Sequence, residues 1–203
     1  MKTSKLLALT GIFGTAAFLA VAADAPAPAA ASAAAPATYT VTLSDVHMCC
    51  GNCVKGAATA VAGLPGVTAV GTQGADTVVV TAPDKATAQK AVDALTNSGF
   101  FGKSSDAAIK VNADTGATAG KVSSLDISNL HLCCAKCVTA VNDVLGKVPG
   151  VTGNTAKVKA ATFTVTGDFS PKAVMDAFQA AGLTGKAGAT KPEAAPAATS
   201  AKS

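Results

Sequence analysis

The 203-residue sequence contains no arginine and no tryptophan, and tyrosine occurs only once. Proteins that bind nucleic acids usually present a basic stripe together with side chains that stack on bases or grip phosphates. The formal net charge is +4, and two of the lysines, Lys2 and Lys5, lie at the extreme N-terminus. Without those two lysines the charge is about +2. The composition therefore argues against a nucleic-acid-binding protein.

Cysteine and histidine are also scarce, and all of them lie in two short segments. Residues 47–53 (HMCCGNC) and residues 131–137 (HLCCAKC) both read H-x-C-C-x-x-C and begin 84 residues apart, 131 minus 47. Thiolate sulfur and imidazole nitrogen are ligands for soft and borderline metals. The candidate metal ligands are Cys50, Cys53, Cys134, Cys137, Cys49, Cys133, His47 and His131.

The two segments are the centres of an internal repeat. Leu-Pro-Gly-Val at residues 64–67 corresponds to Val-Pro-Gly-Val at residues 148–151. The pattern Gly-x-x-Gly-Lys closes both copies, at residues 99–103 and 182–186. The chain is therefore predicted to hold two copies of one structural unit of roughly 65–75 residues each.

The N-terminus has the pattern of a secretory signal peptide. Lys2 and Lys5 precede an apolar stretch from Leu6 to about Ala23, which ends in small residues suited to cleavage. We expect residues 1–23 to be removed, the mature protein to be periplasmic or secreted, and no stable membrane span to remain. An uncleaved anchor is the alternative, because the apolar stretch approaches the length of a span.

Three further segments have the composition of connecting or unstructured chain. Residues 24–37 and 189–203 are rich in alanine and proline with few charges, which predicts a disordered leader and a disordered tail. Residues 113–120 have the composition of a linker. The remaining residues, 38–112 and 121–188, are the two predicted domains.

Apolar periodicity and turn residues predict the same element order in both domains. The elements predicted in the first domain are a strand at 39–46, a helix at 52–64, strands at 67–70 and 77–82, a helix between 83 and 99, and a short strand between 100 and 111. Those predicted in the second are a strand at 121–130, a helix from 135 to about 147, strands near 151–158 and 161–166, and a helix from about 170. The order strand, helix, strand, strand, helix, strand is the split β-α-β or ferredoxin-like motif. We therefore predict an α+β fold with two ferredoxin-like domains in tandem.

The residues between the first strand and the first helix carry a resemblance to a known family. The chain resembles the heavy-metal-associated domains of copper chaperones, of metal-pumping P-type ATPases and of the periplasmic mercury-binding protein. Their motif is M-x-C-x-x-C, and residues 48–53 fit it at every fixed position. In the second copy Leu132 replaces the methionine, while Cys134 and Cys137 fit. The segment at 64–67 is also similar. The resemblance implies a tandem heavy-metal-associated domain protein that binds metal through these cysteines.

The two histidines and the extra cysteines, Cys49 and Cys133, are not part of the family motif. Two thiolates on an exposed loop suit Cu(I), which is held by few ligands. Zn(II) prefers four ligands, which the cysteines and histidine of one segment would supply, or which two domains would share. Because adjacent cysteines project in different directions, all three cysteines of one domain are not expected to bind one ion together.

Other interpretations of the same residues stay open. Secreted cysteines usually form disulfides, so Cys50–Cys53 and Cys134–Cys137 are alternatively staples in an interaction module without metal. A periplasmic thiol–disulfide redox protein is a further alternative, although the duplicated order is not the thioredoxin pattern. The histidines have the alternative role of capping the loop. Met48 and Leu132 are expected to be apolar plugs beneath the loop rather than ligands.

The sequence therefore predicts an exported heavy-metal-binding protein that buffers, sequesters or delivers metal. Cu(I) is the favoured ion and Zn(II) the alternative, and the expected partners are metal ions and a protein that donates or accepts them. The sequence contains no recognisable set of nucleophile, base and orienting residue and no phosphate-cradling loop, so we do not expect an enzyme.

Overall fold

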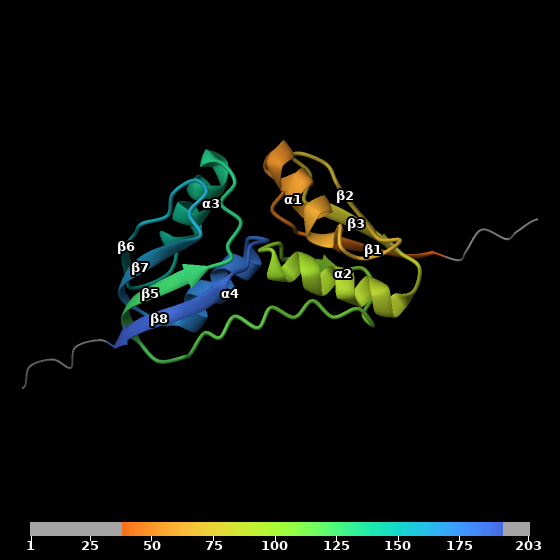
Figure 1. The fold of residues 1–203 in the computed structure, drawn as a ribbon. Coiled ribbons are helices and arrows are strands. Elements are labelled where there is room, and N and C mark those ends of the chain that lie inside the picture. The colour runs from red at the N-terminus through yellow and green to blue at the C-terminus, as the bar shows by residue number, and fades with distance from the viewer. Residues whose placement is uncertain (1–37, 193–203) are drawn as a thin grey trace, which may run out of the picture. The chain divides into compact units, whose positions relative to one another are not determined.

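The computed structural model describes residues 38–192, which form two halves with the same order of elements (Figure 1). The predicted signal peptide (1–23), the leader (24–37) and residues 193–203 lie outside the described residues. The first half contains β1 (Tyr39–Ser44), α1 (Gly51–Val61), β2 (Thr68–Gly71), β3 (Thr77–Ala82), α2 (Lys85–Asn97) and β4 (Lys103–Ser104). The second half contains β5 (Val122–Ser128), α3 (Ala135–Leu145), β6 (Val151–Asn154), β7 (Thr162–Phe169), α4 (Pro171–Ala180) and β8 (Lys186–Pro192). The fold is mixed α+β, as predicted.

Each half contains a four-stranded antiparallel sheet. The strand orders are β2-β3-β1-β4 and β6-β7-β5-β8. Strand β1 pairs with β3 along its whole length, from Tyr39 opposite Ala82 to Ser44 opposite Thr77, and β5 pairs with β7 in the corresponding way. In this order each helix crosses over the strand that lies between the two strands it joins, which is the ferredoxin-like arrangement. The loop that follows β1 or β5 therefore leads directly into a helix lying on the sheet.

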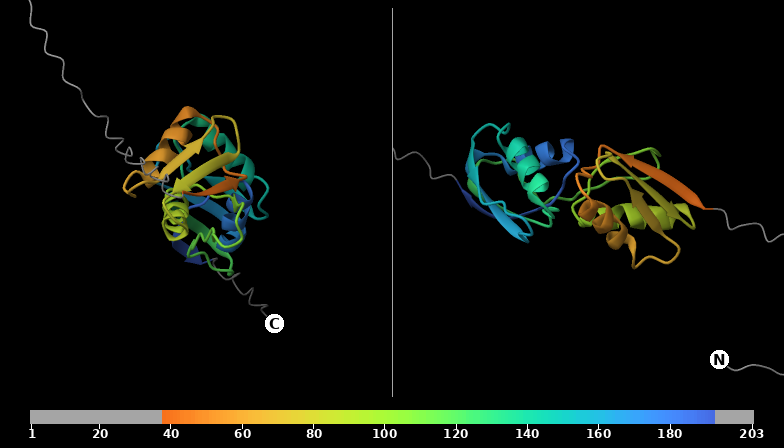
Figure 2. Two further views of the ribbon diagram at one scale, coloured as in Figure 1. Left: turned by 90° about the vertical axis from the view of Figure 1, so that its right-hand side faces the viewer. Right: turned by 90° about the horizontal axis from the view of Figure 1, so that it is seen from above.

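The alternation of apolar residues along the strands places one face of each sheet against two helices (Figure 2). In β3, Val78 and Val80 are buried while Val79 between them is 37% exposed. In the second half, Phe163 of β7 meets Phe178 of α4 edge to face, with ring centroids 6.5 Å apart. Aromatic rings of this kind supply a large share of the buried apolar area. The two helices of each half are thus held to their sheet by a hydrophobic core.

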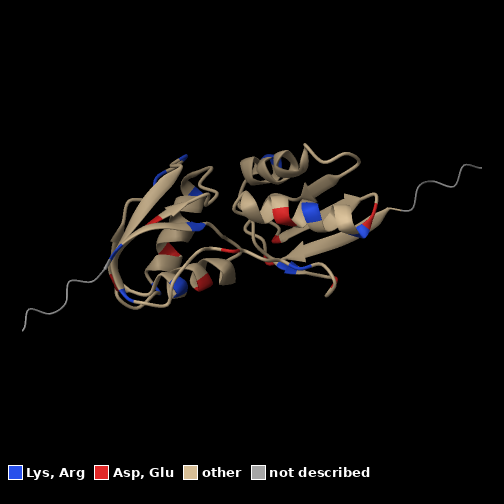
Figure 3. Cartoon of the chain, turned by 60° about the horizontal axis from the view of Figure 1, so that its bottom comes forward, with Lys and Arg blue, Asp and Glu red and all other residues tan. Residues whose placement is uncertain are grey.

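Charged residues contribute little to this packing. Figure 3 shows lysines and acidic residues scattered over the helices, strands and loops. Within residues 38–192 the exposed ion pairs are Lys103–Asp45, Lys121–Asp168 and Lys172–Asp176. Pairs of this kind add little to stability because solvent screens them. No helix within residues 38–192 combines the length and the apolar character needed to span a membrane.

The short strand predicted between residues 100 and 111 is found as β4, which is two residues long. The start of the tail differs from the sequence-based expectation. The sequence predicts a disordered tail from residue 189, and this start is wrong because β8 continues to Pro192. Thr190 and Lys191 are opposite Leu125 and Ser124 of β5, so backbone pairing extends the strand. No helix or strand lies in the described residues between Ser104 and Val122, a range that contains the predicted linker at 113–120.

Candidate metal centre

Each H-x-C-C-x-x-C segment begins where the first strand of its half ends. Asp45 and Asn129, at equivalent positions, adopt left-handed backbone conformations with φ of 59° and 57°. Aspartate and asparagine tolerate this conformation better than most residues. The kink ends the strand and starts the cysteine loop. Met48 and Leu132 are only 2% and 4% exposed and belong to the hydrophobic core, so their predicted role as apolar plugs is confirmed.

The second and third cysteines of each segment straddle a helix N-terminus, as predicted. Cys50 and Cys134 are the N-cap residues of α1 and α3, and their carbonyl oxygens accept hydrogen bonds from the first turn. The sulfurs of Cys50 and Cys53 are 3.7 Å apart, and those of Cys134 and Cys137 are 3.9 Å apart. The partial positive charge of a helix N-terminus stabilises thiolates. Each half therefore presents a pair of closely spaced sulfurs at a helix N-terminus.

Residues 38–192 belong to one compact unit, and the turns that follow α2 and α4 join the two halves. Phe100 and Leu183 form an antiparallel bridge, and both side chains are buried. The N–H of Phe101 donates to the carbonyl oxygen of Gly182 at 3.3 Å. The N–H of His47 donates to the same oxygen at 3.2 Å. The turn of the second half thus supports the cysteine loop of the first.

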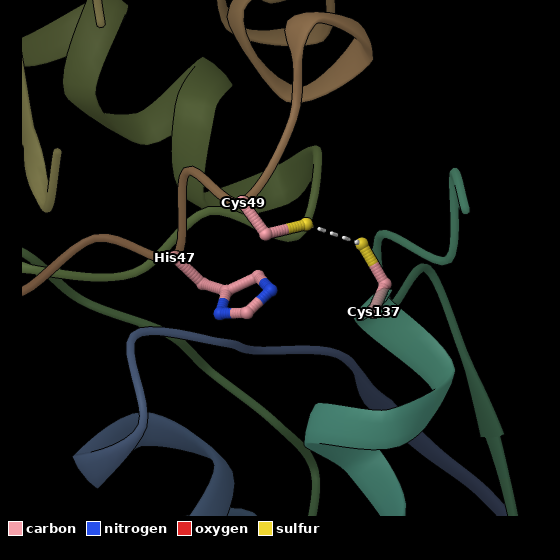
Figure 4. A group of neighbouring side chains, drawn as sticks. All are labelled: His47, Cys49 and Cys137. Carbon is pink, nitrogen blue, oxygen red and sulfur yellow. Dashed lines mark hydrogen bonds between the residues drawn. The ribbon is translucent and has the colours of Figure 1, made fainter. Parts of the chain in front are cut away.

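This contact brings the two cysteine segments together. All six cysteines are free thiols. Sulfurs from opposite halves approach each other in four pairs: Cys50–Cys133 at 3.3 Å, Cys53–Cys133 at 3.5 Å, Cys49–Cys137 at 3.5 Å and Cys49–Cys134 at 3.7 Å. Figure 4 shows Cys49 and Cys137 pointing toward one another. Each pair has a counterpart at the equivalent repeat positions, so the thiol cluster has approximate two-fold symmetry.

The cluster offers several sets of ligands. Among the described residues, four groups of three donor atoms lie within 4.8 Å of one another. The groups are His47, Cys49 and Cys137; Cys49, Cys50 and Cys53; Cys50, Cys133 and Cys134; and Cys53, Cys133 and Cys137. Three of the four combine residues of both halves. The fourth, Cys49, Cys50 and Cys53, corrects the expectation that three cysteines of one domain cannot face one ion, because the sulfurs of Cys49 and Cys50 both lie 3.7 Å from that of Cys53. The structure therefore brings together all six cysteines and one of the two histidines that the sequence singles out.

The two histidines have different surroundings. The buried Nε2 atoms of both histidines have no hydrogen-bond partner among the described residues. His47 lies beside Cys49 and Cys137 (Figure 4). His131 belongs to none of the four groups, and its ring lies against Phe100 with centroids 4.7 Å apart. Burial lowers the pKa of His131, which favours the neutral ring. We assign His131 to packing between the halves, whereas His47 is placed to act as a ligand.

Burial and hydrogen bonds within the cluster shift the pKa values of the thiols in different directions. Burial opposes ionisation of Cys50, but hydrogen bonds from the Cys53 N–H and the Cys133 thiol outweigh it and lower the pKa of Cys50 to about 6. A hydrogen bond from Cys53 lowers the pKa of Cys137 as well. Burial raises the pKa of Cys49 to about 12. Cys50 in the first half and Cys137 in the second are therefore the thiols most readily ionised, and binding of metal must displace any proton that a ligating thiol carries.

These ionisation states predict which cysteine reacts first. Because the thiolate is the nucleophile, Cys50 of the metal-free protein is expected to react with iodoacetamide faster than Cys49 at about pH 7. Its rate should rise with pH through about 6 and then level off. Peptide mass spectrometry across a pH series measures this profile, and the Cys50→Ser variant should lose the fast phase. A rate that keeps rising between about pH 7 and pH 9 contradicts the assignment.

Two surface hollows give access to the cluster. One, with a volume of about 510 Å³, is lined by residues that include His47 and Cys49. The other, of about 340 Å³, is lined by residues that include His131 and Cys133. The hollows lie at equivalent positions of the repeat. An ion or a partner's thiol can therefore reach the cluster beside the first cysteine of either segment.

The cysteine motif identifies every sulfur donor, but not the residues that bring the halves together. Gly99, Phe100, Gly182 and Leu183 form that contact. A signal for it exists in the sequence, because Gly-x-x-Gly-Lys recurs at the end of both copies. A glycine that recurs beside a hydrophobic residue indicates a close backbone approach.

Comparison with known proteins adds limited information. No protein-family profile matches the chain, and no curated protein matches it significantly. Among solved structures, the chain is similar to the N-terminal soluble domains of Bacillus subtilis CopA, at 19% identity and a TM-score of 0.28, over 76% of this chain and 97% of that chain. It is also similar to the water-soluble region of the P-type ATPase CopA from Bacillus subtilis, at 19% identity and a TM-score of 0.25, over 76% and 93% of the two chains. Similarity at this level establishes neither fold nor function, so the functional inference depends on the thiol cluster itself.

Proposed function

We propose that the protein binds soft transition-metal ions, with Cu(I) favoured over Zn(II), and buffers, sequesters or delivers them without catalysing a reaction. The observation that supports this function is the gathering of six thiols with sulfur separations of 3.3–3.9 Å. Thiolates bound to one ion at about 2.3 Å lie about 3.8–4.0 Å from one another. The free thiols are therefore within a few tenths of an ångström of ligand spacing.

The donor types favour a soft ion. The four groups consist of cysteines and His47, with no carboxylate among them in the described residues. Thiolate ligands suit Cu(I) and Zn(II), whereas carboxylate and carbonyl oxygens suit Mg²⁺, Ca²⁺ and Mn²⁺. Cys49, Cys50, Cys133 and Cys134 are partly exposed, which allows a partner's thiol to attack a bound ion. This combination supports transfer by ligand exchange rather than permanent storage.

The place where the protein acts is part of the proposal. The signal-peptide pattern of residues 1–23 supports export to the periplasm or the outside of the cell. The thiols must then stay reduced in an oxidising compartment, where disulfides commonly form. Bound metal would protect them, because a coordinated thiolate is not free to attack the disulfide of an oxidising partner.

Intact-mass analysis of the protein purified from its own compartment tests these points together. We expect a chain that begins after about residue 23 and that carries copper under native conditions. The Cys50→Ser/Cys134→Ser double variant should lose the copper under mild chelation, while the wild-type protein retains it. Val70→Ala, a change of a 62%-exposed side chain on β2, is the matched control and should keep it.

The thiol–disulfide redox alternative predicts a different outcome. A chain that carries no metal and is lighter by about 2 Da for each disulfide would contradict the metal-binding proposal. Rapid exchange with a peptide disulfide, unaffected by prior metal removal, would favour the redox function instead.

A further inference from the structure

Most of the cysteines belong to more than one donor group. Five of them, Cys49, Cys50, Cys53, Cys133 and Cys137, each occur in two of the four groups, while Cys134 and His47 occur in one. A thiolate sulfur has enough lone pairs to bind two metal ions at once. All four groups can therefore be occupied simultaneously, provided that the shared sulfurs act as bridges.

We infer that the chain loads about four Cu(I) ions as a single thiolate-bridged cluster shared by both halves. This inference rests on the proposed function and specifies how that function is performed. Three of the ions would each have three sulfur ligands, and the fourth would have two sulfurs and the nitrogen of His47. Loading releases the thiol protons and changes no oxidation state.

The geometry distinguishes this cluster from one separate site in each half. Within the first half, Cys49, Cys50 and Cys53 form one complete group, but each of the other three groups needs cysteines of both halves. The shortest sulfur separation, 3.3 Å between Cys50 and Cys133, also crosses between the halves. A Cys-x-x-Cys pair acting alone would leave Cys49 and Cys133 without a role, although both point into the cluster.

Ligand number selects the ion for this arrangement. Cu(I) is satisfied by about two or three thiolates, so groups of three donors suit it. Zn(II) takes four ligands, and six sulfurs with one histidine then suffice for about two ions. The same donors should therefore hold about twice as many copper ions as zinc ions.

Sharing of sulfurs also makes loading cooperative. The first ion fixes sulfurs that also belong to neighbouring groups. Binding of the next ion therefore loses less conformational entropy in ordering its ligands. Metal-free and fully loaded chains should therefore coexist during a titration, with few chains at intermediate loading.

Native mass spectrometry of the reduced mature chain, titrated with a Cu(I)–acetonitrile complex without oxygen, tests the inference. We expect the metal-free form and a form with about four copper ions to dominate throughout, and saturation with zinc at about two ions. Saturation of the wild-type chain at fewer than four copper ions overturns the inference. Binding of two would leave the proposed function standing, whereas binding of none would also contradict that function.

Two variants test whether shared sulfurs determine the copper capacity. Cys49→Ser/Cys133→Ser leaves one Cys-x-x-Cys pair in each half, and its copper capacity should fall to about two. Cys134→Ser removes a sulfur that belongs to a single group, so the copper capacity of this variant should fall only to about three. An unchanged capacity of four in the first variant contradicts bridging by Cys49 and Cys133.

Discussion

Replacement of Cys137 by serine is expected to weaken Cu(I) binding by more than about 100-fold, because loss of a ligand costs more than the 10–100-fold typical of residues that only support a ligand. Cys137 is fully buried at the N-terminus of α3 and belongs to two of the four donor groups. Its sulfur lies 3.5 Å from that of Cys49 in the other half and 3.6 Å from that of Cys133. Removal of this one sulfur therefore disables two groups at once.

Competition with a chromophoric Cu(I) chelator measures this affinity. Cys134→Ser is the matched control, because the residue is equivalent in chemistry but partly exposed and belongs to one group. Its loss of affinity should be clearly smaller than that of Cys137→Ser. Equal losses of Cu(I) affinity in the two variants would contradict the account, because the number of donor groups that contain a cysteine would then not determine its contribution to binding.

Substitution of Gly182 by alanine is expected to reduce the copper capacity from about four ions to about two without removing any ligand. Gly182 has φ of +73°, which disfavours a side chain. An added methyl group would also overlap the carbonyl oxygen of Asp45 and lie 2.7 Å from the backbone nitrogen of His47. The contact between the halves would then open, and each half would keep only its own three cysteines, enough for about one ion.

The loaded mass of the Gly182→Ala chain gives the copper number directly. Gly63→Ala is the matched control, because a methyl group there meets nothing within 4 Å. It should load as the wild type does. Far-ultraviolet circular dichroism should show that both variants keep their helices. A full complement of four copper ions in a folded Gly182→Ala protein would contradict the role assigned to the contact.

The local elements were predictable where residue type and pattern agree. The strand at 77–82 is found at the predicted residues, because a β-branched run lies between turn residues. Helix α2 begins directly after Asp84, whose side chain accepts a hydrogen bond from the N–H of Thr87. Strand β8 was not assigned to particular residues, because its alanine, glycine and proline residues have low strand propensity and only pairing with β5 stabilises it.

The site was predictable in its chemistry but not in its extent. The repeated motif identifies all six sulfurs, and the helix start explains why Cys50 and Cys53 point together. Sharing between domains was one of several open arrangements. The contact that favours it involves Phe100 and Leu183, which are far apart in the sequence. Periodicity reports local structure, so it cannot show which turn of one half will meet the loop of the other.

Copper K-edge X-ray absorption of the loaded native chain tests most directly whether the six cysteines act as one shared sulfur site. The account predicts sulfur as the dominant neighbour of every copper ion and a second copper ion close by, with the copper–copper signal lost in the Gly182→Ala variant. Copper surrounded by nitrogen and oxygen alone, or bound to sulfur with no copper neighbour, would contradict it.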